Sequence, residues 1–219
     1  MNFKRIRQLG GFWLGLTLGT LLLGFSNAQA GSYDDFFIAV RNDNASVVRD
    51  LLQRGFDPNT RNPTGDIGLI MAFQEESPKA VKLLLAHPGV EVNALNAAGE
   101  SALMMAALKG NLMGMTALVE RGARVNQPGW SAIHYAATGP EVRAVRMLLD
   151  LGADINAASP NGSTPLMMAA QYGTQASAEL LLERGADRAR RNDKNLLAAD
   201  FASHAGRDAL ARKLEPFGR

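Results

Sequence analysis

The sequence predicts an all-α solenoid, in which pairs of short helices stack one after another along a single array. The prediction rests first on the phrase Asn161–Ala170 (NGSTPLMMAA), weaker copies of which recur along the chain. One apolar position of this phrase returns at spacings of 34, 30 and 33 residues, at Leu69, Leu103, Ile133 and Leu166. It rests second on a Gly-containing phrase that closes each copy, at residues 55–59, 89–93, 122–126, 152–156 and 185–187. A period near 33 residues is the signature of a repeat architecture.

The two phrases together resemble those of the ankyrin repeat. The resemblance covers nearly all of the chain after residue 32. It implies an ankyrin-repeat solenoid of helix-turn-helix units joined by β-hairpin-like turns. It also implies a protein that displays a binding surface, because this fold brings no catalytic site of its own.

The most regular copy predicts two antiparallel helices. Thr164 is placed to cap the first helix, and Pro165 occupies its first turn, where a missing N–H has no cost. Gly173 is expected to end this helix. The second helix is expected over 176–184, and Gly185 provides the left-handed conformation that stops it.

The repeats divide residues 31–219 into a single domain of five to six units. The terminal units are irregular, as expected for caps that meet water on one face. In register, the units are Ser32–Asn62, Pro63–Ala97, Ala98–Gln127, Pro128–Pro160, Asn161–Asp193 and Lys194–Arg219.

Two interior departures stand out. The helix after Asp66 lacks a Thr-Pro start and has Gly68 in its first turn, which weakens it by about 1–2 kcal/mol. The link from Asn126 to Ile133 is seven residues, whereas Asn93 to Leu103 is ten. The sequence therefore predicts a notch in the row of turns.

The first thirty residues predict a cleavable signal peptide. Lys4, Arg5 and Arg7 precede an uncharged run over 12–25, and Ala28-Gln29-Ala30 supplies the small residues before the cut. The run is short for a membrane span of about 20 residues, so an uncleaved anchor is the less favoured alternative. We expect a periplasmic or secreted protein with no stable membrane insertion after cleavage.

The charge balance indicates no nucleic-acid partner. The whole chain has 23 basic and 21 acidic side chains, and losing three basic ones with the signal would leave a formal charge of −1. The chain has no Cys, so its stability must come from repeat stacking rather than disulfides. Because capped arrays need no second chain, we expect a monomer.

The resemblance places the binding surface on the concave face, formed by turn tips and exposed positions of each first helix. Tyr, Trp and Met are common at the centres of protein interfaces. The residues expected to contact a protein partner are Met105, Lys109, Trp130, Tyr135, Thr138, Met168, Gln171, Tyr172 and Phe201. Turn tips are expected to add Arg61, Asn62, Asn96, Ser159, Arg191 and Asn192.

Packing between repeats is the alternative for several of these side chains. Met105 and Met168 suit either role, while Met104 and Met167 take the family's His position and favour packing. Trp130 follows Pro128-Gly129 on the shortened turn, so it either contacts a partner or folds back over the Asn126 turn.

No catalytic constellation is evident, and we expect neither an enzyme nor a bound cofactor. The three His are far apart in the sequence, and His134 occupies the repeat's own His position, which predicts a structural hydrogen bond. A Cu(I) site is a remote alternative, since Cu(I) favours thioethers and the chain carries Met104, Met105, Met113, Met115, Met167 and Met168.

These observations predict an exported protein-interaction module. Similar small exported proteins imply two specific roles: immunity, by binding a delivered toxin, and an accessory role in periplasmic catalase and peroxide defence. A carrier of a small molecule or metal is the alternative from another class. No residue selects among them.

Overall fold

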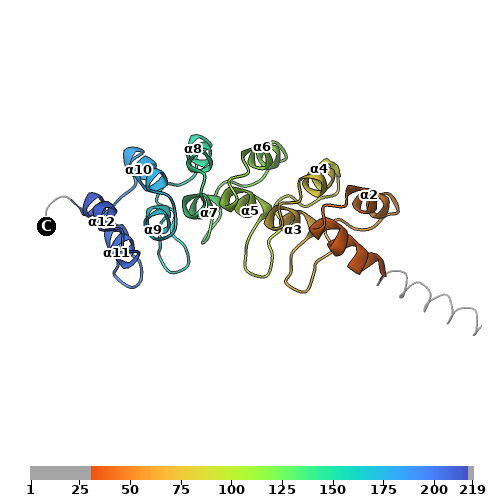
Figure 1. Ribbon diagram of the computed structural model, residues 1–219, viewed down its shortest axis with the longest axis horizontal. Helices are drawn as coiled ribbons and strands as arrows, with labels where there is room; N and C mark the ends of the chain where they lie inside the picture. Colours follow the sequence, from red (N-terminus) through yellow and green to blue (C-terminus); the bar gives the residue numbers. More distant parts are fainter. Residues whose placement is uncertain (1–30, 217–219) are drawn as a thin grey trace, which may run out of the picture.

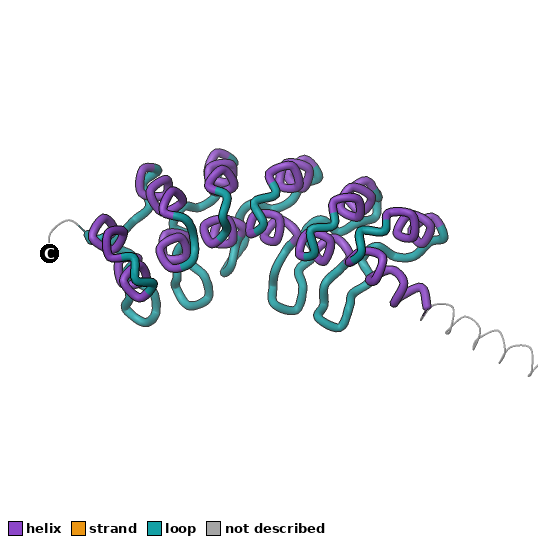
Figure 2. The backbone as a smooth tube through the Cα atoms, in the orientation of Figure 1, coloured by secondary structure: helices purple, strands orange, loops and turns teal. Residues whose placement is uncertain are grey.

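The computed structural model describes residues 31–216, and the proposed signal peptide lies outside them. The described chain is a stack of antiparallel helix pairs without a strand, as expected for an all-α solenoid (Figure 2). A helix over 31–41 opens the array. The helices that follow are α2 (Ala45–Gln53), α3 (Gly68–Gln74), α4 (Pro78–Ala86), α5 (Ala102–Leu108), α6 (Leu112–Glu120), α7 (Ala132–Thr138), α8 (Val142–Asp150), α9 (Pro165–Gln171), α10 (Gln175–Glu183), α11 (Ala198–His204) and α12 (Asp208–Leu214).

The helices form two layers in a shallow arch (Figure 1). The odd-numbered helices from α3 to α11 form the inner layer, and each packs against the next inner helix. The even-numbered helices from α2 to α12 form the outer layer. An inner helix has only seven residues, or two turns, which is too short to be stable alone. The fold therefore depends on stacking between units.

The inner helices α5 and α9 each begin with a reciprocal pair of contacts between the cap residue and the third helical residue. Thr164 Oγ1 accepts the Met167 N–H at 3.4 Å, as the sequence predicted for the cap, and Ser101 caps Met104 in the same way. In return, the third helical side chain accepts the N–H of the cap residue, a contact that α7 and α11 also make. This acceptor is Sδ in Met104 and Met167, Nδ1 in His134 and a carboxylate in Asp200. Both Met104 and Met167 are fully buried, as expected.

Glycines mark the closest approaches between units. α9 ends at Gln171, close to the Gly173 that the sequence predicted as its end, and Gly173 does not have a positive φ. A Cβ on Gly173 would instead collide with the Ala137 carbonyl oxygen of the preceding inner helix. Gly68 has the same kind of explanation, since a Cβ there would lie 2.7 Å from the Phe36 ring. Gly185 does adopt the predicted left-handed conformation, with φ 91°.

Asparagines at the end of the Gly-containing phrase bridge neighbouring units. Asn93 Nδ2 donates to the Gly122 carbonyl at 2.9 Å, and its Oδ1 accepts the Arg124 N–H at 2.8 Å. The same two contacts join Asn59 to residues 89 and 91, and Asn126 to residues 152 and 154. Asn156 accepts the Asp187 N–H at 2.9 Å. Because the bridge reaches the same position of the next unit each time, it sets the register of the stack.

The link before α7 is short, as predicted. The turns before α3 and α5 each close with an isolated antiparallel bridge, between Arg61 and Ile67 and between Leu95 and Ser101. Figure 2 shows these turns, and those before α9 and α11, as long loops below the inner layer, while the loop before α7 is shorter. The row of turns therefore has a notch at this unit.

Replacing Asn93 by Ala should lower the free energy of unfolding by about 1–3 kcal/mol, because two hydrogen bonds between units are lost. Urea denaturation followed by circular dichroism measures the change. Lys82→Ala, an exposed substitution on α4, is the matched control and should leave the midpoint unchanged. Equal midpoints for both variants would contradict the assigned role of the bridge.

Candidate functional site

Five of the nine side chains expected to contact a partner surround one pocket on the inner layer. Tyr135 and Thr138 come from α7, Met168 and Tyr172 from the end of α9, and Trp130 from the short turn. Leu108 and His134 complete the lining of a cavity of about 260 Å³. Apart from the imidazole, the indole N–H, the Thr hydroxyl and the Tyr hydroxyls, the walls are apolar. Such a cavity suits an apolar group from a ligand or a partner.

Trp130 forms one wall of the pocket. Its ring centroid is 5.2 Å from that of His134 and 6.4 Å from that of Tyr135, and both pairs meet edge to face. Gln127 Nε2 donates to the Trp130 carbonyl at 3.0 Å and thereby closes the short turn. The indole is half-buried against α7, so part of it remains available at the notch.

Tyr135 connects the pocket to two carboxylates. Its hydroxyl donates to Glu100 Oε1 at 2.7 Å. The Asn96 amide donates to Glu100 Oε2 and to Asp66 Oδ1, each at 2.9 Å. Burial, and then the contact with Glu100, raises the pKa of Tyr135 well above its ordinary value of 10.0. The phenol therefore stays protonated and continues to donate at neutral pH.

His134 holds the floor of the pocket in place. Nδ1 accepts a hydrogen bond from the Ser131 backbone N–H, with 3.2 Å between the two nitrogens. Nε2 must then carry the ring proton, and it donates toward the carbonyls of Ala157 at 3.1 Å and Ser163 at 3.2 Å. Burial lowers the pKa of His134 below its ordinary value of 6.5. The imidazole is neutral and fully engaged, which confirms the predicted structural hydrogen bond.

The other four expected contact residues lie outside the pocket. Met105 is only 5% exposed and belongs to the packing between units. The Lys109 ammonium group lies 2.8 Å from Glu76 of the preceding unit. Gln171 and Phe201 are half-buried on α9 and α11. Met168 is buried, as the packing alternative predicted, and it also lines the pocket.

The turn residues Ser159 and Asn192 were expected at exposed tips, and this expectation is wrong. They are 4% and 7% exposed, respectively. Asn192 Oδ1 accepts the N–H groups of Lys194 and Leu196, each at 3.0 Å, and Ser159 Oγ accepts the Ser163 N–H. Side chains at this position fold inward because they satisfy the backbone of the turn.

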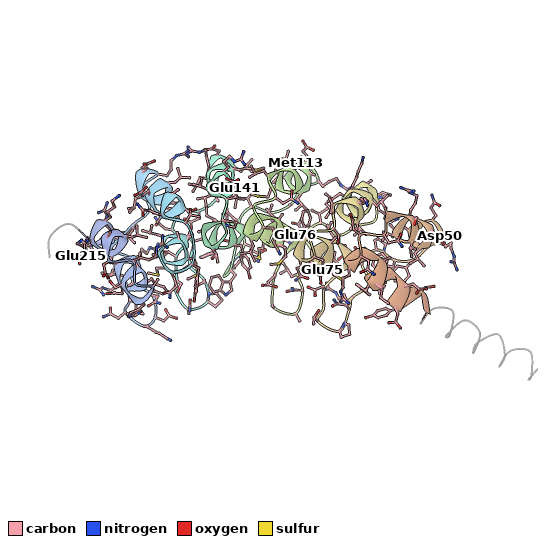
Figure 3. The ribbon with its side chains drawn as sticks, viewed as in Figure 1. Asp50, Glu75, Glu76, Met113, Glu141 and Glu215 are labelled. Atoms are coloured by element: carbon pink, nitrogen blue, oxygen red, sulfur yellow. The ribbon has the colours of Figure 1, made fainter. Side chains whose placement is uncertain are left out.

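Metal-binding groups are not clustered in the part of the chain that the structure describes. Residues 31–216 contain no group of three His, Asp or Glu side chains placed to hold an ion. The methionines considered for Cu(I) lie in different environments. Met104, Met105, Met115, Met167 and Met168 are buried, whereas Met113 is 86% exposed on α6 of the outer layer (Figure 3). Within the same residues, every helix is too short or too polar to cross a bilayer.

The fold and the pocket define a helical repeat protein with a binding face. The family profile described as ankyrin repeats (3 copies) matches residues 36–128 and 125–192. The chain therefore belongs to the ankyrin-repeat family, and ankyrin repeats form protein–protein interaction modules.

Curated relatives carry the same repeats within much longer chains. The nuclear factor NF-kappa-B p105 subunit of Gallus gallus is 32% identical over 157 residues, which is 68% of this chain and 16% of the relative. The human transient receptor potential cation channel subfamily A member 1 is 29% identical over 159 residues, covering 68% of this chain and 14% of the relative. This chain thus spans less than a fifth of either protein.

One solved structure resembles nearly the whole array. It contains the predatory endopeptidase Bd0816 from Bdellovibrio bacteriovorus in complex with the immunity protein Bd3460. One of its chains superposes with a TM-score of 0.69 at 27% sequence identity, covering 83% of this chain and 98% of that chain.

Sequence reasoning missed the carboxylate network beside the pocket. The signal for it was an Asn followed four residues later by an acidic side chain, as in Asn62 with Asp66 and Asn96 with Glu100. Within each pair, the Asn accepts the N–H of the acidic residue. What the spacing did not reveal is that Asn96 also reaches Asp66 in the previous turn, because that contact exists only between stacked units.

The stability of the protein should decrease as the pH falls below about 6.5. There the unfolded chain binds a proton at His134 that the folded protein, with its lowered pKa, does not bind. The negative charge of the nearby Asp154 favours the protonated imidazole and so partly opposes the lowering of the His134 pKa. Urea denaturation between about pH 7.5 and pH 5 measures the slope.

His134→Met is the matched variant, because Met occupies the equivalent position in Met104 and Met167. It should flatten the dependence on pH over this range. A variant as pH-sensitive as the parent would show that other groups cause the loss of stability.

Proposed function

We propose that this chain is an exported immunity protein, which holds a peptidase on its concave inner face and keeps it inactive. The observation that supports this most directly is the similarity to a chain from the peptidase–immunity complex. That chain is covered over 98% of its length, so it is a helical repeat array with no room for a separate catalytic domain. We infer that it is the immunity protein of that complex.

The pocket supports a protein partner. Trp and Tyr are frequent anchors at the centres of interfaces, and they contribute most where water is excluded. Trp130, Tyr135 and Tyr172 surround a single cavity on the inner layer, beside the notch in the turns. The outer layer carries Met113 as its most exposed large apolar side chain among the described residues, away from this cavity (Figure 3).

Export is proposed on the sequence of residues 1–30 alone. If it is correct, the protein recovered from the cell envelope or medium should have the mass of residues 31–219, because cleavage follows Ala30. Intact-mass measurement tests this. Ala30→Leu should block cleavage and give the mass of the full chain, while Ser26→Ala serves as a control that leaves processing intact. Recovery of only the full-length parent chain would contradict cleavage.

Peptidase neutralisation is tested by capture followed by an activity assay. The chain, immobilised, should retain from its own cell envelope a protein that hydrolyses a peptide substrate. Adding an equimolar amount of the free chain should abolish that hydrolysis. A chain carrying both Trp130→Ala and Tyr172→Ser should be a weaker inhibitor by about tenfold or more. Met113→Ser, on the outer layer, should inhibit like the parent.

Two outcomes would contradict the proposal. A captured partner without peptidase activity would leave an interaction module but not this immunity role. A strain lacking the gene that grows normally except under peroxide would instead support the accessory role in oxidative defence.

A further inference from the structure

The size of the pocket limits what it can hold. An engineered protein cavity of about 150 Å³ accommodates one benzene molecule, so about 260 Å³ is room for one aromatic side chain and not for a helix or strand. The walls suit such a ring. Trp130 and Tyr172 offer aromatic surfaces, and Met168 offers a sulfur, which interacts favourably with ring edges.

The pocket is reachable through the notch. Tyr172 is 66% exposed and forms its rim. The loop before α7 is shorter than those before α5 and α9, which project below the inner layer on either side (Figure 2). A loop of a partner protein can therefore approach Trp130 between the flanking turns.

The charge beside the pocket is negative and lacks a basic partner. Glu100 and Asp66 share the Asn96 amide, and their other hydrogen-bond donors are the neutral groups of Tyr135, Thr64, Asn62 and Gln74. Within residues 31–216, neither carboxylate forms an ion pair. The ammonium group of Lys109, which follows the pocket residue Leu108, is already paired with Glu76. A cationic side chain from outside would complement the two carboxylates.

We propose that the partner inserts one aromatic side chain into this pocket and places a lysine or arginine beside Glu100. This assignment rests on the proposed function, which supplies a protein partner, and it specifies the chemistry of the partner's contact loop. The aromatic ring supplies most of the affinity because it leaves water completely, and the basic side chain selects the correct loop.

Short peptides test the assignment without the peptidase. Residues two apart in an extended peptide project to the same side, so the probe is acetyl-Phe-Gly-Lys-amide. Its comparators replace Phe by Ala, Lys by Glu, or both. Binding is followed by NMR at the indole N–H of Trp130 in the full chain, assigned with a Trp13→Phe variant. A single anchored side chain is expected to give a Kd on the order of 1 mM.

The expected result is a clear order of affinities. Replacing Phe by Ala should weaken binding about tenfold or more, and replacing Lys by Glu about threefold. Tyr172→Ser, at an exposed rim position that does not threaten the fold, should weaken the Phe peptide, while Met113→Ser should not. Glu100→Gln should remove the preference for Lys over Glu, provided that urea denaturation shows an unchanged fold.

Three results would overturn the assignment: no shift with the Phe–Lys peptide, equal binding of the Ala peptide, or unchanged binding by the Tyr172→Ser protein. Failure of the proposed function looks different. Peptide binding without peptidase inhibition would leave the pocket assignment standing and remove the immunity role. If Tyr172→Ser still inhibits the peptidase and the peptides do not bind, the immunity role stands and the pocket assignment is removed.

Discussion

The structure depends on stacking between units that cannot bury their own apolar faces. A two-turn inner helix is too short to persist alone, and it becomes stable only when the helices before and after it cover its sides. The asparagine bridges from Asn59, Asn93, Asn126 and Asn156 then select one register for this stacking. Apolar burial supplies the driving force, and the directional amide contacts decide how the units align.

Repeated positions keep a physical role while the residue type changes. In the inner helices from α5 to α11, the third side chain accepts the N–H of the cap residue, whether the acceptor is a thioether, an imidazole or a carboxylate. Gly68 and Gly173 are explained in the same terms, because each leaves room for a neighbouring unit rather than acting on its own backbone. Departures from the family pattern are therefore local solutions to contacts between units.

The candidate site is a consequence of one such departure. Shortening the link between Asn126 and Ile133 removes the projecting turn and brings Trp130 directly against α7. The indole then forms a wall of a cavity whose other walls come from α5, α7 and α9. A regular turn in this place would project between its neighbours, as the turns before α5 and α9 do. The cavity thus arises from one local departure within the stacked array.

The sequence by itself determined the helical repeat, the Thr164 cap, the notch and the structural role of His134, because these follow from local spacing and backbone chemistry. Its predicted set of nine contact residues also included five of the seven side chains that line the pocket. Only the tertiary structure showed that Tyr135 lines the pocket with Trp130 and Tyr172. Met105 occupies the same repeat position as Tyr135 but is buried outside the pocket. The tertiary structure alone joined Glu100 to Asp66 through Asn96 and set Gly173 against Ala137. Those contacts cross from one unit to the next, and their distances depend on how closely the units stack, which the spacing of residues along one chain does not specify.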